Sequence, residues 1–100
     1  MITLTAQQKK HLRAMAHDLK PVVYVGRHGL SEAVVKDIGR ALNDHELTKV
    51  RFVGCKDERR ELSRIIAERT GAALLGVTGH LALFYRRSEL AQKQRIVLAQ

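Results

Sequence analysis

The sequence predicts a two-layer α/β fold of the α+β kind, with the element order αβαβαββ and helices packed on a four-stranded mixed sheet. Short apolar runs rich in β-branched residues alternate along the chain with amphipathic segments of helical period. Strands that alternate with helices pair in parallel through right-handed crossovers. The last two apolar runs are separated only by Gly79-His80, which predicts an antiparallel hairpin.

The first helix is expected over residues 6–18. Thr5 and Gln8 have the spacing of a capping box, and apolar residues recur at helical spacing after them: Leu12, Met15, Ala16 and Leu19. Pro21 ends this helix, because the residue before a proline is pushed out of the helical region. Residues 22–25 then form an unbroken apolar run, which predicts a strand buried on both faces.

A second helix is expected from about residue 30 to residue 44, because five apolar residues fall on one of its faces: Leu30, Val34, Ile38, Ala41 and Leu42. The segment LTKVRFVG, residues 47–54, follows it. Val50 and Phe52 alternate there with Lys49 and Arg51, so this strand has one apolar and one basic face. The basic face is either an ordinary polar sheet surface or part of a binding surface.

Asp57 is expected to cap a third helix, and Gly71 is a suitable residue to end it. ALLGVTG and HLALFYRR are the two strands of the closing hairpin. Residues 88–100 form a charged tail that is either extended or a frayed helix. Residues 1–87 are therefore expected to form a single domain, with the tail outside it.

The chain has 100 residues and a formal net charge of +8, with a pI near 10.3, which favours nucleic acid as the partner over an anionic membrane or an acidic protein. Its single Cys55 cannot form an internal disulfide, and the N-terminus lacks the apolar region of a secretory signal. No apolar run approaches the roughly 20 residues that span a bilayer. A cytoplasmic monomer with no membrane association is expected.

Gly26, Arg27, His28 and Gly29 lie between the first strand and the second helix. A loop at that junction presents backbone N–H groups and the positive end of a helix dipole, and its glycines let a phosphate come close. The alternative is a tight turn with no ligand. No G-K-[ST] and no third glycine follow, so a nucleotide-binding enzyme is not expected.

The other reactive residue types predict no further chemistry. The five histidines lack the spacing of a metal site, and the mixed charges at residues 57–61 are typical of a solvated helix surface. The four aromatic residues all lie in apolar strand runs, so an exposed platform for stacking bases is not expected. We therefore expect no enzyme activity, metal, cofactor or small-molecule substrate.

Several short motifs together resemble the CRM domain, specifically that of the small stand-alone bacterial YhbY-like proteins. They are Ala16-His17, Leu19-Lys20-Pro21, the G-x-x-G loop with Leu30 after it, Ala41-Leu42, and His45-Glu46-Leu47 before the basic strand. The element order continues to match to about Arg87. Ser31 stands where threonine is common in the family, and its hydroxyl can still cap a helix.

The resemblance implies an RNA-binding module whose fold is similar to the C-terminal domain of a bacterial translation initiation factor, with helices on one face of the sheet. It implies that the loop, Gly26 to Gly29, contacts RNA with the support of basic residues: Lys9, Lys10, Arg13, Lys20, Arg86 and Arg87. The partner would be large-subunit ribosomal RNA or its precursor particle during ribosome assembly. The alternative is a protein-interaction module whose basic face meets an acidic partner.

Overall fold

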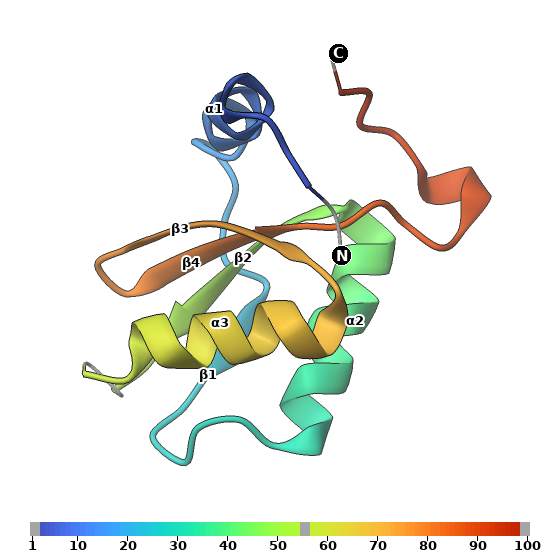
Figure 1. Ribbon diagram of the computed structural model, residues 1–100. Coiled ribbons are helices and arrows are strands. Elements are labelled where there is room, and N and C mark those ends of the chain that lie inside the picture. The colour runs from blue at the N-terminus through green and yellow to red at the C-terminus, as the bar shows by residue number, and fades with distance from the viewer. Residues whose placement is uncertain (1–2, 55–56, 99–100) are drawn as a thin grey trace.

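The computed structural model describes residues 3–54 and 57–98, and Cys55 lies outside these residues. Its elements confirm the predicted order αβαβαββ. They are α1 (Ala6–Met15), β1 (Val23–Val25), α2 (Glu32–His45), β2 (Leu47–Phe52), α3 (Arg59–Thr70), β3 (Ala73–Thr78) and β4 (Leu81–Tyr85), followed by the short 3-10 helix η1 (Ala91–Lys93) (Figure 1). No helix within the described ranges is long and apolar enough to cross a membrane.

The four strands form one mixed sheet in the order β1-β2-β4-β3. The β1 strand runs parallel to β2, with Val25 opposite Phe52, and the other two pairs are antiparallel. Gly79 has a φ of 56° in the turn between β3 and β4, which is a conformation that glycine adopts without strain. The predicted closing hairpin is therefore confirmed.

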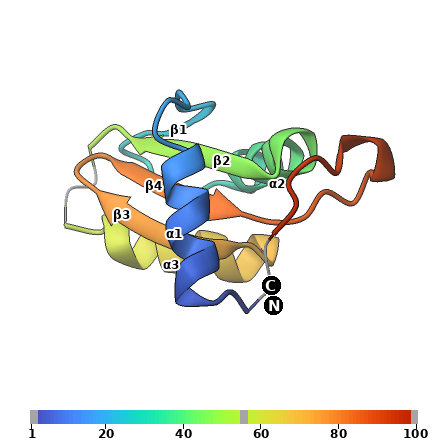
Figure 2. The ribbon, with the colours of Figure 1, turned by 90° about the horizontal axis from the view of Figure 1, so that it is seen from above.

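The α2 and α3 helices cover one face of the sheet, and α1 crosses the opposite face (Figures 1 and 2). Ile38 of α2 and Ile66 of α3 pack with Val25, Val50 and other strand residues in the larger core. A second, smaller cluster joins α1 to the outer face of the sheet through Leu12, Ala16, Leu47, Leu75 and Tyr85. The expectation that all helices share one face is thus wrong for α1.

The α1 helix begins as predicted and ends earlier. The Gln8 amide donates to Thr5 Oγ1 at 3.1 Å, and the Thr5 amide donates to Gln8 Oε1 at 2.9 Å, which completes the capping box. The helix stops at Met15 rather than residue 18. The chain turns at once toward β1, and Lys49 Nζ holds this turn by donating to the Leu19 carbonyl at 2.9 Å.

The expectation that β1 is buried on both faces is also wrong. Val23 and Val25 are buried against the larger core, whereas Tyr24 between them is 57% exposed. This strand lies at an edge of the sheet, and α1 packs on residues of β2, β3 and β4 instead. Only one face of β1 is therefore covered.

The start of α3 differs from the prediction as well. The N-cap is Glu58 rather than Asp57, and no side chain makes a capping hydrogen bond there. The Arg59 guanidinium instead donates to the Gly79 carbonyl at 2.8 Å and lies 2.8 Å from His80 Nδ1. These contacts hold the start of α3 against the β3–β4 turn.

The chain after β4 folds back onto the domain through Glu46, the residue that follows α2. Glu46 is 1% exposed and has a φ of 63°, which is uncommon for any residue other than glycine. Its carboxylate accepts hydrogen bonds from the amides of Ser88 at 2.7 Å, Arg95 at 2.7 Å and Ile96 at 3.0 Å. Ile96 and Leu98 also pack against the α1-side cluster, so this segment covers one end of the outer face.

Burial by itself raises the pKa of Glu46, but the three donated backbone hydrogen bonds and the nearby charge of Arg87 outweigh it and hold the pKa below the ordinary glutamate value. A lowered folded-state pKa stabilises the fold at neutral pH. That contribution is lost as the pH falls through the folded-state value. The attachment of the C-terminal segment is therefore sensitive to acid.

We expect Glu46→Gln to release the segment from the domain at neutral pH, because an amide offers one acceptor oxygen and turns an N–H₂ group toward the backbone donors. Hydrogen exchange of the Ser88, Arg95 and Ile96 amides should accelerate at least tenfold. Glu89→Gln, an exposed charge-matched change in the same segment, should leave these rates unchanged. Equal rates in both variants would contradict this role of Glu46.

Candidate nucleic-acid interface

The glycine loop is a tight turn between β1 and α2. The Gly29 amide donates to the Gly26 carbonyl at 3.0 Å, and Gly29 has a φ of 75°. Ser31 then caps α2, with its Oγ accepting from the Val34 amide at 3.1 Å. The strand, turn and helix follow one another as the sequence predicts.

The two glycines differ in what the fold requires of them. Gly29 has the positive φ that favours glycine, whereas Gly26 does not. A Cβ at Gly26 would meet nothing within 4 Å. Neither backbone conformation nor packing therefore explains Gly26, and its effect is to leave bare backbone at the exposed start of the turn.

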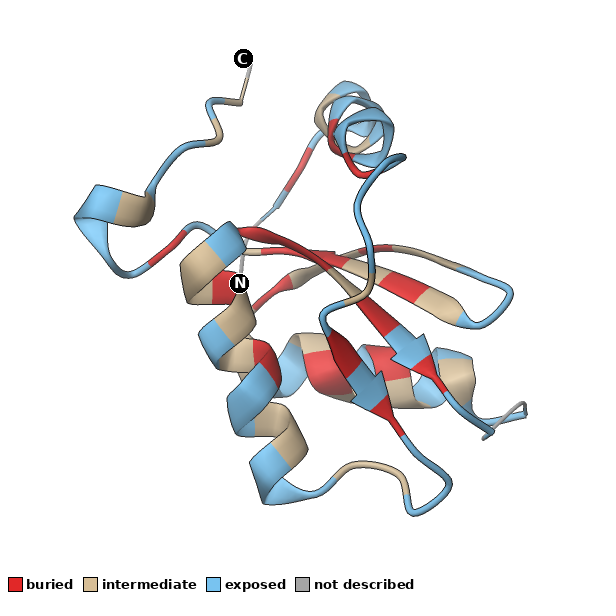
Figure 3. Cartoon of the chain, turned by 180° about the vertical axis from the view of Figure 1, so that it is seen from behind, coloured by how far each residue is buried: buried red, intermediate tan, exposed pale blue. Residues whose placement is uncertain are grey.

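Arg27 and His28 are exposed at the tip of this turn. Arg27 lies beside the end of β2, since a Cβ placed on Gly54 would be 3.7 Å from Arg27 Cγ. The turn and the residues after β2 thus meet at one end of the sheet, at the bottom of the view in Figure 3.

The α2 helix points its N-terminus at the turn, so its first N–H groups and the positive end of its dipole lie there. Its first turn also contains an acidic residue, Glu32. Both Glu32 carboxylate oxygens accept from Arg69 of α3, at 2.7 and 2.8 Å, so this negative charge is already paired. The turn can accept an anion without an unpaired carboxylate beside it.

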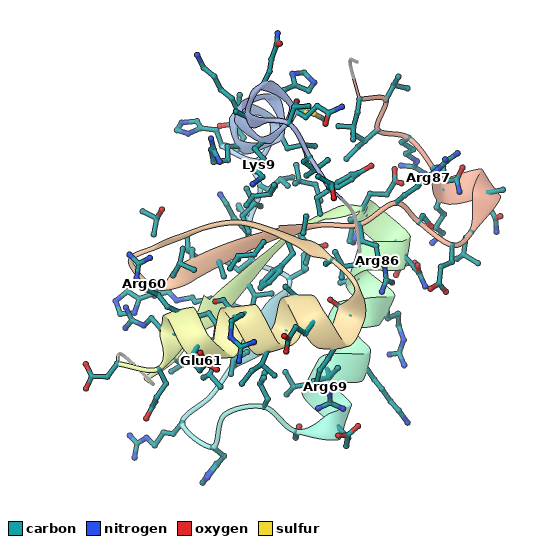
Figure 4. The ribbon with its side chains drawn as sticks, in the orientation of Figure 1. Lys9, Arg60, Glu61, Arg69, Arg86 and Arg87 are labelled. Carbon is teal, nitrogen blue, oxygen red and sulfur yellow. The ribbon has the colours of Figure 1, made fainter. Side chains whose placement is uncertain are left out.

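The basic residues of α1 do not lie next to the glycine turn. Figure 1 places α1 and the turn on opposite sides of the molecule. Lys9 points from α1 toward β3 (Figure 4), and Arg13 donates to the Leu75 carbonyl of that edge strand at 3.1 Å. Lys10 is exposed on α1. Lys20 is also exposed, in the connection that leads down to β1, next to the Leu19 carbonyl that Lys49 holds.

Arg86 and Arg87 lie at the far end of the sheet (Figure 4). They follow Tyr85, which pairs with the first residue of β2, whereas the glycine turn follows Val25, which pairs with the last. Five residue steps of a strand separate these ends by about 17 Å.

Arg86 serves the fold rather than a surface. Its half-buried guanidinium donates to the Thr70 carbonyl at 2.6 Å, the Gly39 carbonyl at 2.9 Å and Asn43 Oδ1 at 3.0 Å. These hydrogen bonds join β4 to α2 and to the end of α3. Arg86 therefore lies outside the candidate interface. Arg87 is exposed and donates to Gln94 Oε1 at 2.8 Å within the folded-back segment.

The outer face of β1 and β2 carries two basic residues whose role the sequence does not decide, and a tyrosine whose exposure it does not predict. Lys49 and Arg51 lie on this face because Val50 and Phe52, which alternate with them, are buried on the other. Tyr24 is the register partner of Arg51. The alternation in LTKVRF indicated the two basic residues, but an uninterrupted apolar run gave no sign that Tyr24 is exposed.

We name six residues the basic strip: Lys20, Tyr24, Arg27, His28, Lys49 and Arg51. They run from the connection after α1, across the uncovered part of the sheet, to the glycine turn. Figure 3 shows this side of the molecule, with exposed positions on both neighbouring strand arrows. A shallow groove beside α1 continues the strip and is lined partly by Arg13, His17, Lys49 and Leu81.

The charges of the molecule are distributed unevenly. Eight of the ten acidic residues lie between positions 32 and 68, in α2 and α3 and the segments at their ends, and the other two are Asp18 and Glu89. None lies in α1 or in any of the four strands. The outer face of the sheet is therefore the basic side of the molecule, and the α2–α3 side carries most of the negative charge.

The described part of the chain contains no group of three or more histidine, aspartate or glutamate side chains placed to hold a metal ion. Of the predicted site residues, the structure places Gly26, Arg27, His28 and Gly29 together in the glycine turn and Lys20 at the other end of the basic strip. The other predicted residues lie away from the glycine turn: Lys9, Lys10, Arg13, Arg86 and Arg87.

Comparisons with known proteins agree with one another. The model of the CRS1/YhbY (CRM) domain matches residues 4–86. An RNA-binding protein of Haemophilus influenzae is 43% identical over 95 residues, which cover 94% of this chain and 96% of the relative. A probable RNA-binding protein of Pseudomonas aeruginosa is 39% identical over 93 residues, which cover 92% and 89%. The solution structure of a hypothetical protein from Staphylococcus aureus has a TM-score of 0.78 at 31% identity, covering 95% of this chain and all of that one.

Arg86→Ala should destabilise the fold by about 2–3 kcal/mol, because it removes three donated hydrogen bonds and leaves their partly buried acceptors without this donor. Arg87→Ala removes the same charge from an exposed neighbour and should cost no more than about 0.5 kcal/mol. Urea unfolding of both variants measures the difference. Equal destabilisation would contradict the structural role of Arg86.

Proposed function

The chain belongs to the CRS1/YhbY (CRM) domain family, and from this premise we propose that it is a non-enzymatic RNA-binding protein that uses the basic strip as its interface. The observation that carries the proposal is the continuity of the strip, which joins the glycine turn to the connection after α1. The names of the relatives from Haemophilus influenzae and Pseudomonas aeruginosa support RNA as the class of partner.

In this proposal the glycine turn binds one phosphate of the RNA backbone. The N–H groups at the start of α2 and the helix dipole attract the anion, and Arg27 and His28 orient it. Gly26 matters because a side chain there would stand where the phosphate approaches. This gives a functional reason for a glycine that the fold itself does not need.

The remaining cations of the strip neutralise neighbouring phosphates. Lys49 and Arg51 lie two residues apart on one face of β2, about 7 Å along the strand, and Lys20 extends the row toward α1. Arg51 has no hydrogen-bond or ion-pair partner among residues 3–54 and 57–98, so its guanidinium is available to an incoming phosphate. Binding of this kind releases counterions and weakens steeply with salt.

We further propose that the RNA is large-subunit ribosomal RNA, bound in a precursor particle in the cytoplasm. The resemblance to the stand-alone bacterial YhbY-like proteins supports this choice. RNA recognition through phosphates and exposed bases also suits a folded ribosomal RNA better than a regular duplex, because the deep major groove of an RNA duplex is closed to side chains.

The test is the sedimentation of the protein through sucrose gradients of cell lysate at low and high salt. At low salt the wild-type protein should migrate with the large subunit or a lighter precursor, and high salt should release it. Gly26→Asp should lower the bound fraction about tenfold while the protein stays folded, because the position has an ordinary φ and open space around it.

Arg64→Gln is the matched control. It also lowers the net charge by one, but on α3, where Arg64 pairs with Glu61 and Glu68. It should migrate with the particle as the wild type does. Equal loss in both variants would mean that net charge, not the turn, controls binding. A wild-type protein that stays at the top of the gradient at every salt concentration would contradict ribosomal association and favour an acidic protein partner.

A further inference from the structure

Tyr24 is the one exposed residue among the tyrosines and phenylalanines of the described part of the chain. Phe52, Phe84 and Tyr85 are each no more than 3% exposed and belong to the two cores, whereas Tyr24 is 57% exposed. Its hydroxyl has no hydrogen-bond partner within the described ranges. The fold buries the two neighbours of Tyr24 and gains little from its ring, so the ring is available for a partner.

The residues around the ring of Tyr24 indicate which class of molecule it can bind. Tyr24 is opposite Arg51 in the register of β1 and β2, and it lies two residues before Gly26, about 7 Å along the chain from the phosphate-binding turn. Val22 and Val53, at 49% and 52% exposed, provide apolar surface close to it. No acidic residue belongs to either strand, and Asp37, Arg40 and Asp44 of α2 line a pocket together with Tyr24. The ring of Tyr24 thus lies between Arg51 and the glycine turn, which would bind the RNA backbone on either side of a stacked base.

We propose that Tyr24 is a stacking platform for one unpaired nucleobase, whose adjacent phosphate occupies the turn from Gly26 to Gly29. This inference rests on the proposed RNA-binding function and deepens it by naming the RNA feature that is recognised. Aromatic side chains bind bases of any sequence by stacking, because every base has a π-face. Arg51 beside the ring binds the phosphate on the other side of the same nucleotide.

The position of the ring favours an unpaired base over a paired one. A base within a duplex is already stacked on its neighbours and does not offer its face to a side chain, whereas loops and bulges present bases that do. The edge position of β1 leaves space beside the ring, because β1 has a strand neighbour on one side only and α1 packs elsewhere. The protein should therefore prefer structured RNA with exposed bases next to its helices.

Tyrosine fluorescence gives a direct readout, since the chain has two tyrosines and no tryptophan. In a Tyr85→Phe background Tyr24 is the sole fluorophore, and the buried ring at position 85 is retained. The titrant is a hairpin RNA with a loop of unpaired adenosines, compared with a fully paired duplex of equal length. Stacking should quench Tyr24 emission with the hairpin and not with the duplex. Replacing the loop nucleotides by abasic ones should abolish the quenching.

Affinities of the same RNAs provide the second readout. Tyr24→Ala should weaken hairpin binding about tenfold and leave duplex binding unchanged, while Tyr24→Phe keeps the ring and should bind as the wild type does. With the abasic loop, the wild type and Tyr24→Ala should bind equally. Circular dichroism of Tyr24→Ala confirms that the fold is intact.

The outcomes separate this inference from the function on which it rests. If the wild type binds the hairpin but Tyr24→Ala binds it equally well and Tyr24 emission is not quenched, the stacking platform is wrong and RNA binding stands. An equal loss for hairpin and duplex would also overturn stacking, since it would indicate a general contact. If the wild-type protein binds neither RNA, both the inference and the proposed function are wrong.

Discussion

The packing of Leu12 and Ala16 on the sheet decides which part of the outer face stays open. These two residues fasten α1 over β2, β4 and β3, where they meet Leu47, Leu75 and Tyr85. The α1 helix ends at Met15, and no residue of β1 belongs to this cluster. The uncovered area therefore lies between α1 and the glycine turn, and the basic strip occupies it. If α1 packed with α2 and α3 on the other face, the outer face would lack this cover, and the packing of α1 would not limit which part of it a partner can reach.

The segment after β4 limits this surface at its other end. Glu46 binds three backbone amides of the segment, and Ile96 and Leu98 then pack against the α1-side cluster. The apolar surface at the start of β2 is thereby covered by the chain itself. What remains for a partner is the outer face of β1 and β2 up to the glycine turn, where Tyr24, Arg51 and the turn itself are exposed.

The sequence predicts what depends on local pattern. Apolar periodicity yields the seven elements in order, the capping box yields the start of α1, and alternation in LTKVRF yields the outward direction of Lys49 and Arg51. The remaining features depend on how distant segments meet. An apolar run does not reveal that Tyr24 lies beyond the reach of α1, and an arginine after a strand does not reveal that Arg86 will find three acceptors on α2 and α3. The buried role of Glu46 needs the backbone amides of residues 88, 95 and 96, which only the folded chain brings to it.

The measurement that tests the central claim most directly is an NMR titration of the protein, labelled with ¹⁵N, with a hairpin fragment of large-subunit ribosomal RNA. If the RNA lies along the basic strip, the largest amide shifts should fall in residues 20–29 and 49–53, with little change in the outer face of α3 or in residues 88–98. Shifts that are largest in α3 or in the C-terminal segment, with the glycine turn unmoved, would contradict the account.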